Sequence, residues 1–421
     1  MTVVLGCIAD DFTGATDLAG MLARFGMRAV QTIGVPTQPA SEIEADAIIV
    51  ALKSRTISPE DAIQQSLEAL KWLQAGGAKR FYFKYCSTFD STESGNIGPV
   101  AEALMDALGA QQAIACPAFP ENGRTVFKGY LFAGDVLLNE SGMQDHPLTP
   151  MTDANLVRVL ASQSKRGVGL VDYQSIRRGS DVVSAALKTL LSEGKSLVIA
   201  DATDENDLRV LAEASVDHPL LTGGSGLAVG IPSALEAAGL FKSTGAAVDL
   251  PEVGGMSAVI SGSCSRATNE QVRLFKEEHP AFQIDPLALA EGRDLATEAL
   301  VWASSKLADG PLLVYATAEP EAVRAAQAKI GRDKAGALVE EALATVAAGL
   351  CELGARRLVV AGGETSGAVV QRLGVEALRI GREIDPGVPW CSAVGQPLAL
   401  ALKSGNFGAP DFFKKAISIA P

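Results

Sequence analysis

Short apolar runs alternate with stretches of helical period through the first half of the chain, and this alternation restricts the fold more than any other feature. Runs such as Val3–Ala9, Ala47–Leu52 and Arg80–Lys84 have the length and character of buried strands. The segments between them, such as 15–25 and 59–74, read as helices. Strands that alternate with helices form parallel sheets with covering helices. The sequence therefore predicts an α/β fold in which each domain is a mostly parallel sheet covered by helices.

The chain is long enough for two such domains. A single core rarely grows beyond about 250–300 residues, and this chain has 421. The segment 241–255 mixes Gly, Pro and small residues without a clear period, as linkers do. We therefore predict one domain over 1–240, a linker over 241–255 and a second domain over 256–421, with the active site in the cleft between the domains.

Composition restricts the class of partner and the compartment. The formal net charge is -13 and no run is rich in Lys or Arg, so we expect neither a nucleic-acid partner nor an anionic membrane surface. The six cysteines lack metal-ligand spacing, as expected of free thiols in a reducing cytoplasm. Only three histidines occur, which argues against a histidine metal site or a Ser-His-Asp triad. The first strand ends at two aspartates, so we expect neither a signal peptide nor a membrane span there.

Polar side chains follow several of the expected strands. In open α/β sheets ligands bind outside the carboxyl ends of the strands, so these side chains should meet in one crevice. Asp10 and Asp11 follow the first strand. Adjacent carboxylates can accept hydrogen bonds from the hydroxyl groups of a polyol, and one could remove a proton from a nucleophilic hydroxyl. The alternative is that Asp10, Asp11 or Thr13 only caps the following helix.

Cations occupy the same predicted edge. Arg55 and Lys84 follow further strands, with Lys53 nearby, and Arg124 lies in the later segment 117–153 with Asn122. Because Arg and Lys bind carboxylates, this placement predicts an acidic small molecule as the ligand. The polar stretch 87–92, which includes Thr88, Asp90 and Ser91, could add hydrogen bonds. Segment 117–153 is too long for a plain connection, and we expect it to be a functional loop that closes over the crevice.

In the second half, glycine turns follow three expected strands. A glycine pair between a strand and a helix turns backbone N–H groups toward a ligand, and the helix N-terminus adds partial positive charge. These turns predict a phosphate site, although each could be a tight turn that binds nothing. Its candidate residues are Ser261, Gly262, Ser263, Gly362, Gly363, Glu364, Thr365 and Gly405. A triphosphate also needs a divalent cation, for which Glu364 is a weak candidate, so the metal ligands stay open. A further glycine turn, 222–226, could hold an anion or be purely structural.

Four motifs resemble those of the four-carbon acid sugar kinase family. They are ADDFTGA at 9–15, KYCSTFDST at 84–92, CPAFPENGR at 116–124 and GGETS at 362–366, and the likeness covers nearly the whole chain. The second motif, together with GYLF at 129–132, most resembles the branch of the family that acts on 3-oxo-tetronate.

The resemblance implies a transferase with an N-terminal domain for the sugar acid and a C-terminal domain for ATP with Mg²⁺. It implies phosphorylation of the 4-hydroxyl of the acid. It places ATP on the glycine turns of the second half and the acid near Asp10, Asp11, Arg55 and Lys84. Neither the residues nor the resemblance identifies the base, for which our candidates are Asp11 and Asp10.

Three other functions remain open from the sequence. The closest is a D-threonate or D-erythronate 4-kinase, since the motifs do not settle what stands on C3 of the acid. A second is a non-catalytic sensor of a nucleotide or a sugar acid, and a third is a ligase that activates an acid with ATP. The sequence leaves the oligomeric state, including a homo-oligomer, open as well.

Overall fold

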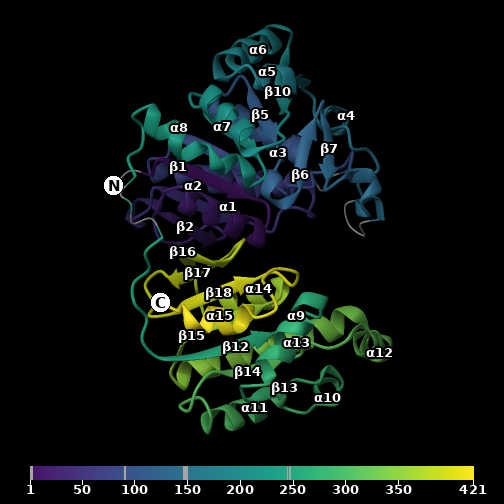
Figure 1. Cartoon of the computed structure of the whole chain (residues 1–421), viewed down its shortest axis with the longest axis vertical. Coiled ribbons are helices and arrows are strands. Elements are labelled where there is room, and N and C mark those ends of the chain that lie inside the picture. The colour runs from purple at the N-terminus through teal and green to yellow at the C-terminus, as the bar shows by residue number, and fades with distance from the viewer. Residues whose placement is uncertain (1–2, 90–91, 146–149, 244, 246–247) are drawn as a thin grey trace. The chain divides into compact units, whose positions relative to one another are not determined.

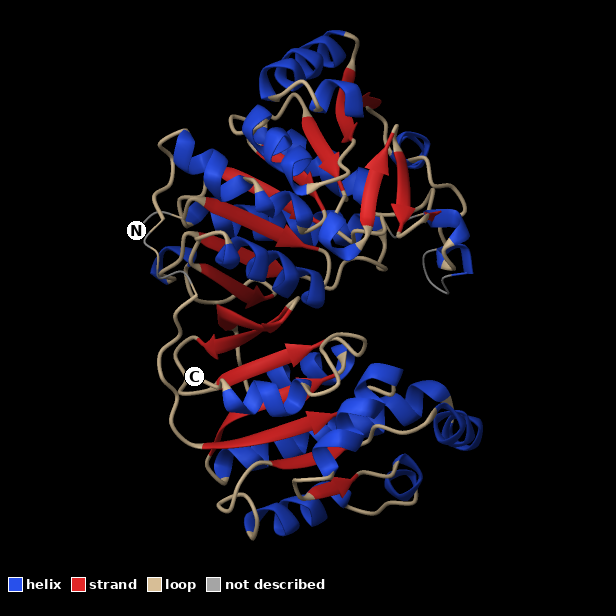
Figure 2. Ribbon diagram, in the orientation of Figure 1, coloured by secondary structure: helices blue, strands red, loops and turns tan. Residues whose placement is uncertain are grey.

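The computed structural model describes residues 3–89, 92–145, 150–243, 245 and 248–421. The chain forms two compact units, Met1–Ala247 and Val248–Pro421. In each unit, helices cover a sheet that is wholly or mostly parallel, which confirms the predicted α/β class (Figures 1 and 2).

The sheet of the first unit is parallel throughout, in the order β2-β3-β1-β4-β11-β5-β10-β9. In register, Ala9 at the end of β1 pairs with Ala51 of β3 on one side and with Lys84 of β4 on the other. The tails of these three strands therefore start side by side. The strands are β1 (Leu5–Ala9), β2 (Ala29–Ile33), β3 (Ala47–Ala51), β4 (Arg80–Lys84), β5 (Ala113–Cys116), β9 (Gly167–Val171), β10 (Lys195–Ala200) and β11 (Leu220–Gly223).

The helices of this unit form two layers. Helix α3 packs against α2 and α4, whereas α1 and α7 pack against the short helix η5 and α6 packs against α7. The connections that leave β1, β9 and β10 run toward β2, and those that leave β3, β4 and β5 run toward β9. Right-handed crossovers put the two sets on opposite faces. The helices are α1 (Phe12–Arg24), α2 (Pro59–Ala75), α3 (Ile97–Leu108), α4 (Leu156–Gln163), α5 (Tyr173–Ile176), α6 (Ser180–Ser192), α7 (Glu205–Ala214) and α8 (Ile231–Ala237), with 3-10 helices η1 (Ala40–Glu42), η2 (Pro120–Asn122), η3 (Leu138–Glu140), η4 (Met143–Asp145) and η5 (Gly226–Val229).

The directions of the strand connections indicate where a ligand can bind. The connections from the neighbouring strands β1 and β4 leave in opposite directions. Such a switch point opens a crevice at the carboxyl ends of the strands. Asp10, Asp11 and Lys84 lie at this point.

Segment 117–153 was expected to be a loop, and that prediction is wrong for most of its described part. It contains a three-stranded antiparallel sheet formed by β6 (Arg124–Phe127), β7 (Tyr130–Ala133) and β8 (Val136–Leu137). Tight turns with positive φ at Lys128, Gly129 and Gly134 join the strands. The glycines that suggested a loop instead lie in the hairpin turns between short strands, and Pro120 begins the 3-10 helix η2.

The sheet of the second unit is mixed, in the order β13-β14-β12-β15-β18-β17-β16. Its first five strands are parallel, and β17 is antiparallel to both of its neighbours. The strands are β12 (Met256–Ser261), β13 (Ala281–Gln283), β14 (Leu312–Tyr315), β15 (Ala355–Ala361), β16 (Ala377–Asp385), β17 (Val388–Ala393) and β18 (Ala399–Lys403). The helices are α9 (Arg266–Lys276), α10 (Pro286–Ala290), α11 (Leu295–Ser304), α12 (Pro320–Ile330), α13 (Arg332–Glu352), α14 (Gly363–Arg372) and α15 (Phe412–Ser418).

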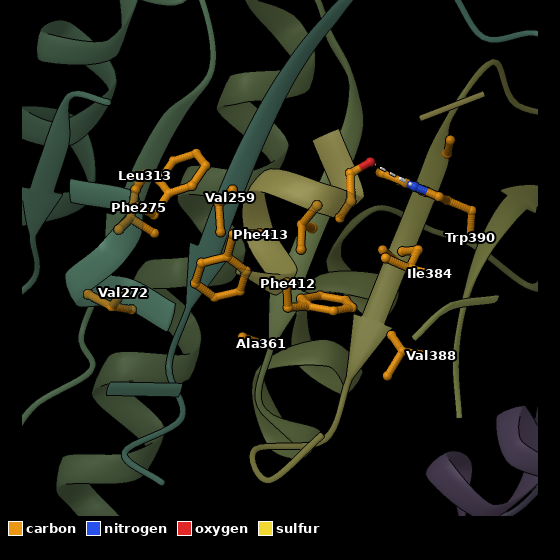
Figure 3. Close-up of a cluster of buried hydrophobic side chains, with 14 of the residues drawn as sticks. Val259, Val272, Phe275, Leu313, Ala361, Ile384, Val388, Trp390, Phe412 and Phe413 are labelled. Carbon is orange, nitrogen blue, oxygen red and sulfur yellow. Dashed lines mark hydrogen bonds between the residues drawn. The ribbon is translucent and has the colours of Figure 1, made fainter. Parts of the chain in front are cut away.

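One hydrophobic cluster of this unit lies between the sheet and the pair α9 and α15 (Figure 3). Phe413 contacts Phe275 edge to face, with 5.9 Å between ring centroids. The indole nitrogen of Trp390 donates to the carbonyl oxygen of Ala416 at 3.1 Å, so the one polar atom of this buried ring is satisfied. This packing fixes the strands whose tails carry the predicted phosphate site.

None of the helices in the described ranges is long and apolar enough to cross a membrane. All six cysteines are free thiols, and Cys7, Cys116 and Cys391 are buried.

Candidate active site

Asp10, Asp11 and Arg55 meet at the carboxyl edge of the first unit. Arg55 Nε donates to Asp10 Oδ2 at 2.9 Å, and Nη2 donates to Asp10 Oδ1 at 2.8 Å. The same Nη2 donates to Asp11 Oδ1 at 2.7 Å. Because two strand tails supply these groups, the parallel register of β1 and β3 is what brings them together. The structure thus joins three of the predicted site residues in one ion-paired cluster.

Lys84 belongs to the same cluster. It is the last residue of β4 and only 3% exposed, and its Nζ donates to the carbonyl oxygen of Tyr85 at 2.8 Å. A methyl group on Gly14 would lie 3.0 Å from Lys84 Nζ and would overlap Asp11 Oδ1. The ammonium and the carboxylate therefore both border Gly14, where no side chain fits.

Asp11 also caps α1. Its Oδ1 accepts from the backbone N–H of Gly14 at 3.0 Å, and its Oδ2 accepts from Thr13 Oγ1 at 2.8 Å. The capping role considered from the sequence is therefore present, and it coexists with the ion pair to Arg55. The cap fixes the rotamer of Asp11 and leaves part of the carboxylate accessible, since the side chain is 26% exposed.

The two aspartates have opposite pKa shifts. Burial raises the pKa of Asp10 above its ordinary value, and the charge of Arg55 offsets only part of that effect. Burial also acts to raise the pKa of Asp11, but the charges of Arg55 and Lys84, together with hydrogen bonds from Thr13 and Gly14, outweigh it, and the pKa of Asp11 lies below its ordinary value. Neighbouring carboxyl groups whose pKa values are driven apart are typical of acid–base sites. Asp11 therefore stays ionised to a lower pH than Asp10.

Asp17 is a third carboxylate of this crevice, and the sequence analysis did not single it out. It accepts a hydrogen bond from Ser225 Oγ. Burial raises the pKa of Asp17, and the positive charge of Lys84 opposes that shift. Asp17 and Gly14 are three residues apart, which puts them on one face of α1. That spacing was the available signal in the sequence.

The glycine turn 222–226 is closely packed. A methyl group on Gly224 would lie 2.8 Å from the carbonyl oxygen of Pro117, and one on Gly226 would overlap the carbonyl oxygen of Ala118. Both glycines thus allow the β11 tail to lie against the β5 tail. This packing supports the structural interpretation of the turn.

Asn122 and Arg124 lie at η2 and the start of β6. Arg124 Nη1 donates to the carbonyl oxygen of Asn122 at 3.0 Å, and Arg124 Nε, which is buried, has no hydrogen-bond partner in the part of the chain that the structure describes. The ion pair of Arg24 with Glu121, at 2.9 Å, ties the same turn to the end of α1. The hydrogen bonds of Arg124 do not reach the aspartate pair.

The remaining predicted polar residues of this unit differ in their environment. Lys53 is exposed, whereas Thr88 is buried, with its hydroxyl 2.9 Å from the thiol of Cys86. Asp90 and Ser91 lie outside the described residues.

In the second unit, three strand tails form the predicted glycine turns. The backbone N–H groups of Gly262 and Ser263 donate to the carbonyl oxygen of Ala361, at 3.0 and 3.1 Å. The N–H of Gly362, which has a φ of 126°, donates to the carbonyl oxygen of Lys403 at 2.9 Å. These bonds hold the tails of β12, β15 and β18 against one another.

The free space at these turns is at Gly363. A methyl group there would meet no atom within 4 Å, whereas one on Gly262 would overlap Thr365 Oγ1 and one on Gly405 would overlap Ser263 Oγ. Gly363 is the first residue of α14, and both it and Glu364 are exposed. The N-terminus of α14 is therefore open to an anion.

Ser261 is the predicted residue that is least accessible to a ligand. It is fully buried, and its hydroxyl lies 2.6 Å from that of Thr317. Its side chain supports the turn from beneath. The other predicted residues of the turns lie at the surface of the tails or line the cavity next to them.

A cavity of about 580 Å³ opens beside the turns, entirely within the second unit. The glycine turns contribute Gly262, Ser263 and the segment 362–365 to its wall. Residues of α10, α12 and α13 form further parts of the wall. Apolar side chains such as Leu287 and Val339 share the wall with a few polar ones. A pocket of this size with phosphate-type turns at its edge suits a nucleotide.

The described residues contain no group of three or more His, Cys, Asp or Glu side chains that could hold a metal ion. A cation that accompanies a triphosphate needs fewer protein ligands, because Mg²⁺ binds mainly through phosphate oxygens and waters. Glu364, exposed in the first turn of α14, is a carboxylate beside the open glycine turn.

Two family models match the chain. A sugar-binding N-terminal domain matches residues 5–231, and a nucleotide-binding C-terminal domain matches residues 258–413. Each model thus matches most of one structural unit.

Curated relatives match over nearly their whole length. The 3-oxo-tetronate kinase of Burkholderia multivorans is 58% identical over 415 residues, which cover 98% of this chain and 96% of the relative. That of Methylobacterium radiotolerans is 52% identical and covers 100% of both. A crystal structure of a Haemophilus influenzae protein is 46% identical, with a TM-score of 0.87 over 98% of this chain and 99% of that one.

Proposed function

The chain belongs to the 3-oxo-tetronate kinase family, and we propose from this that it transfers the γ-phosphoryl group of ATP to the 4-hydroxyl of 3-oxo-tetronate. The observation that carries the proposal is the 58% identity to a 3-oxo-tetronate kinase along 98% of the chain. The two units supply the two chemistries that this reaction needs, a charged polar crevice and a nucleotide-sized cavity.

We assign ATP to the cavity of the second unit. The apolar walls from α12 and α13 suit the adenine base of ATP, and the glycine turns suit its phosphates. The open N-terminus of α14 would stabilise negative charge there through its free N–H groups. The residues we assign to ATP are Ser261, through its support of the turn, and Gly262, Ser263, Gly362, Gly363, Glu364, Thr365 and Gly405.

We assign the sugar acid to the crevice of the first unit. Arg55 is already paired with both aspartates, so its main role is to orient them. Arg124 contributes positive charge to the acid, although its Nε is buried and has no hydrogen-bond partner among the described residues. Lys84 contributes positive charge, and Asn122 further polar groups, around the acid.

Asp11 is our choice for the group that accepts the proton of the 4-hydroxyl. Its pKa is lowered and its carboxylate is accessible, so it is ionised and can approach a hydroxyl group. Asp10 is more deeply buried and held at two points, which suits a supporting role. Mg²⁺, held mainly by the phosphates, would neutralise charge during transfer.

Transfer also requires that the sugar-acid domain, 1–240, and the nucleotide domain, 256–421, bring their ligands together. We propose that the linker 241–255 allows the domains to close over both ligands, with the active site in the cleft so formed. Closure would align the 4-hydroxyl with the γ-phosphate and exclude water.

The test is ADP release by the purified protein with Mg·ATP and one acid at a time, chosen from the 3-oxo-tetronates, D-threonate and D-erythronate. Turnover that is fastest on a 3-oxo-tetronate supports the proposal. Turnover on threonate or erythronate alone would keep the kinase and change the substrate. ATP binding without turnover on any acid would overturn the kinase in favour of a sensor or a ligase.

A further inference from the structure

Lys403 is a buried cation beneath the glycine turns, and the site described above gives it no role. It ends β18 and is 1% exposed. Its Nζ donates to Thr268 Oγ1 at 2.9 Å and to the carbonyl oxygens of Ser404 and Gly405, each at 3.0 Å. All three acceptors are neutral, and no carboxylate of the described residues forms an ion pair with it. Buried charges are normally paired, so this ammonium lacks the usual compensation.

The environment of Lys403 disfavours its charge. Burial lowers the pKa of Lys403 to about 8. An anion that arrived nearby would reverse this effect, because an opposite charge favours the charged form of a lysine.

The hydrogen bonds of Lys403 join the turns that we assign to phosphate. Gly405 O accepts from Lys403 Nζ and from Thr268 Oγ1, the latter at 2.8 Å. The backbone of Gly405 in turn abuts the hydroxyl of Ser263. The backbone carbonyl of Lys403 accepts from the N–H of Gly362. The side chain of Lys403 therefore holds the tail of β18 and, through Gly405, borders the tail of β12, whereas its backbone carbonyl holds the tail of β15.

We propose that Lys403 is a positioning residue of the nucleotide site, whose buried ammonium orders the turn at Gly405 and supplies the positive charge that favours a nucleoside triphosphate over an uncharged nucleoside. This inference rests on the proposed ATP site. Lys403 acts through Gly405, Thr268 and its charge, without contact with the phosphates. The missing counter-charge is the polyphosphate itself.

The first experiment compares ATP with adenosine as ligands of the full-length wild type and of Lys403→Met, by calorimetry and by ligand-induced thermal stabilisation. We expect the variant to lose about ten- to a hundred-fold in ATP affinity, as for removal of one nearby charge at intermediate dielectric. Adenosine affinity should change much less. In steady state, the KM for ATP should rise more than kcat falls.

Lys414→Met is the matched control, because it removes the same charge from the same unit at the surface ion pair with Glu278. It should leave both affinities unchanged. A merely structural role for Lys403 predicts instead a lower melting temperature of the free protein and equal losses for ATP and adenosine, and that result would overturn the inference.

A second pair of variants covers the case in which Lys403→Met does not fold. Thr268→Ser keeps the hydroxyl that links Lys403 to Gly405, and Thr268→Val removes it. The serine variant should retain wild-type ATP affinity and the valine variant should lose several-fold. Equal affinities in the two variants would contradict the inference.

The proposed function and the role of Lys403 are contradicted by different results. If the wild type does not bind ATP, the proposed function fails. If the wild type binds ATP and Lys403→Met binds it equally well, only the role of Lys403 fails.

Discussion

Arg55 holds Asp10 at two points, through Nε at 2.9 Å and Nη2 at 2.8 Å. This bidentate geometry fixes a carboxylate more firmly than a single contact does. Because Nη2 also reaches Asp11 at 2.7 Å, one guanidinium sets the geometry of both acids. Four predictions follow from this cluster, from the glycine turns and from Lys403.

Asp11→Asn should lower kcat by about 10²–10⁴-fold, the usual contribution of a general base. Asn caps a helix as well as Asp does, so the free energy of unfolding should change by less than about 1 kcal/mol. Steady-state kinetics and urea unfolding measure the two quantities. Asp204→Asn is the matched control, because Asp204 caps α7 in the same way. An equal loss of kcat in both variants would remove Asp11 from the chemistry.

Arg55→Met should destabilise the protein by about 3 kcal/mol, because it leaves Asp10 buried without its partner. Urea unfolding measures the loss. The double variant with Asp10→Asn should recover part of it, since the amide is neutral. Lys53→Met, at an exposed position in the same turn, should stay within about 0.5 kcal/mol of the wild type. If Arg55→Met is as stable as Lys53→Met, the ion pair does not orient the acids.

Gly363→Ala should raise the KM for ATP by about tenfold, a cost of about 1.4 kcal/mol, because its methyl group would enter the space assigned to phosphate. The melting temperature of the free protein should not fall, since that methyl group meets no atom within 4 Å. Gly254→Ala is equally unhindered and lies away from the turns, so it should change neither quantity. An unchanged KM for Gly363→Ala would argue against phosphate at this turn.

The stability of the free protein should depend on pH through Lys403. The pKa of Lys403 is lowered to about 8 by burial, against an ordinary value of 10.5. The unfolded state therefore binds more protons between these values, and this residue's contribution to stability rises with pH across that window. Below pH 8 the full penalty, about 3 kcal/mol, is present.

Other groups titrate in the same range, so the quantity to measure is the difference between wild type and Lys403→Met in urea unfolding at several pH values. The variant should gain stability relative to the wild type below pH 8, and the difference should shrink toward pH 10.5. A difference that does not vary with pH would mean that the charge of Lys403 is fully compensated in the folded protein.

The meeting of the strand tails is the feature of the candidate site that could be predicted from the sequence. Asp10, Asp11, Arg55 and Lys84 meet because the register of parallel strands aligns their ends, and that alignment follows from the class of fold. Asp17 was missed because it lies on a helix, where its approach to the crevice depends on how α1 packs. Lys403 ends an apolar strand just as Lys84 does, so the same reasoning applied to the second half would have found it.

The long segment after β5 shows where composition misleads. Glycines lie in its turns, but the strands between them are only two to four residues long. Alternation over so few residues gives little periodic signal. The pairing of β6 with β7 is local, because only Lys128 and Gly129 separate the two strands, and this two-residue turn was the signal that was missed.

Identification of the product tests the proposed reaction most directly. The protein would be incubated with Mg·ATP and a 3-oxo-tetronate, and phosphorus NMR would follow the phosphate. We predict a phosphomonoester on C4 that forms in equal amount with ADP. An acyl phosphate, release of AMP with pyrophosphate, or ADP without a phosphorylated acid would contradict the assignment as a sugar-acid 4-kinase.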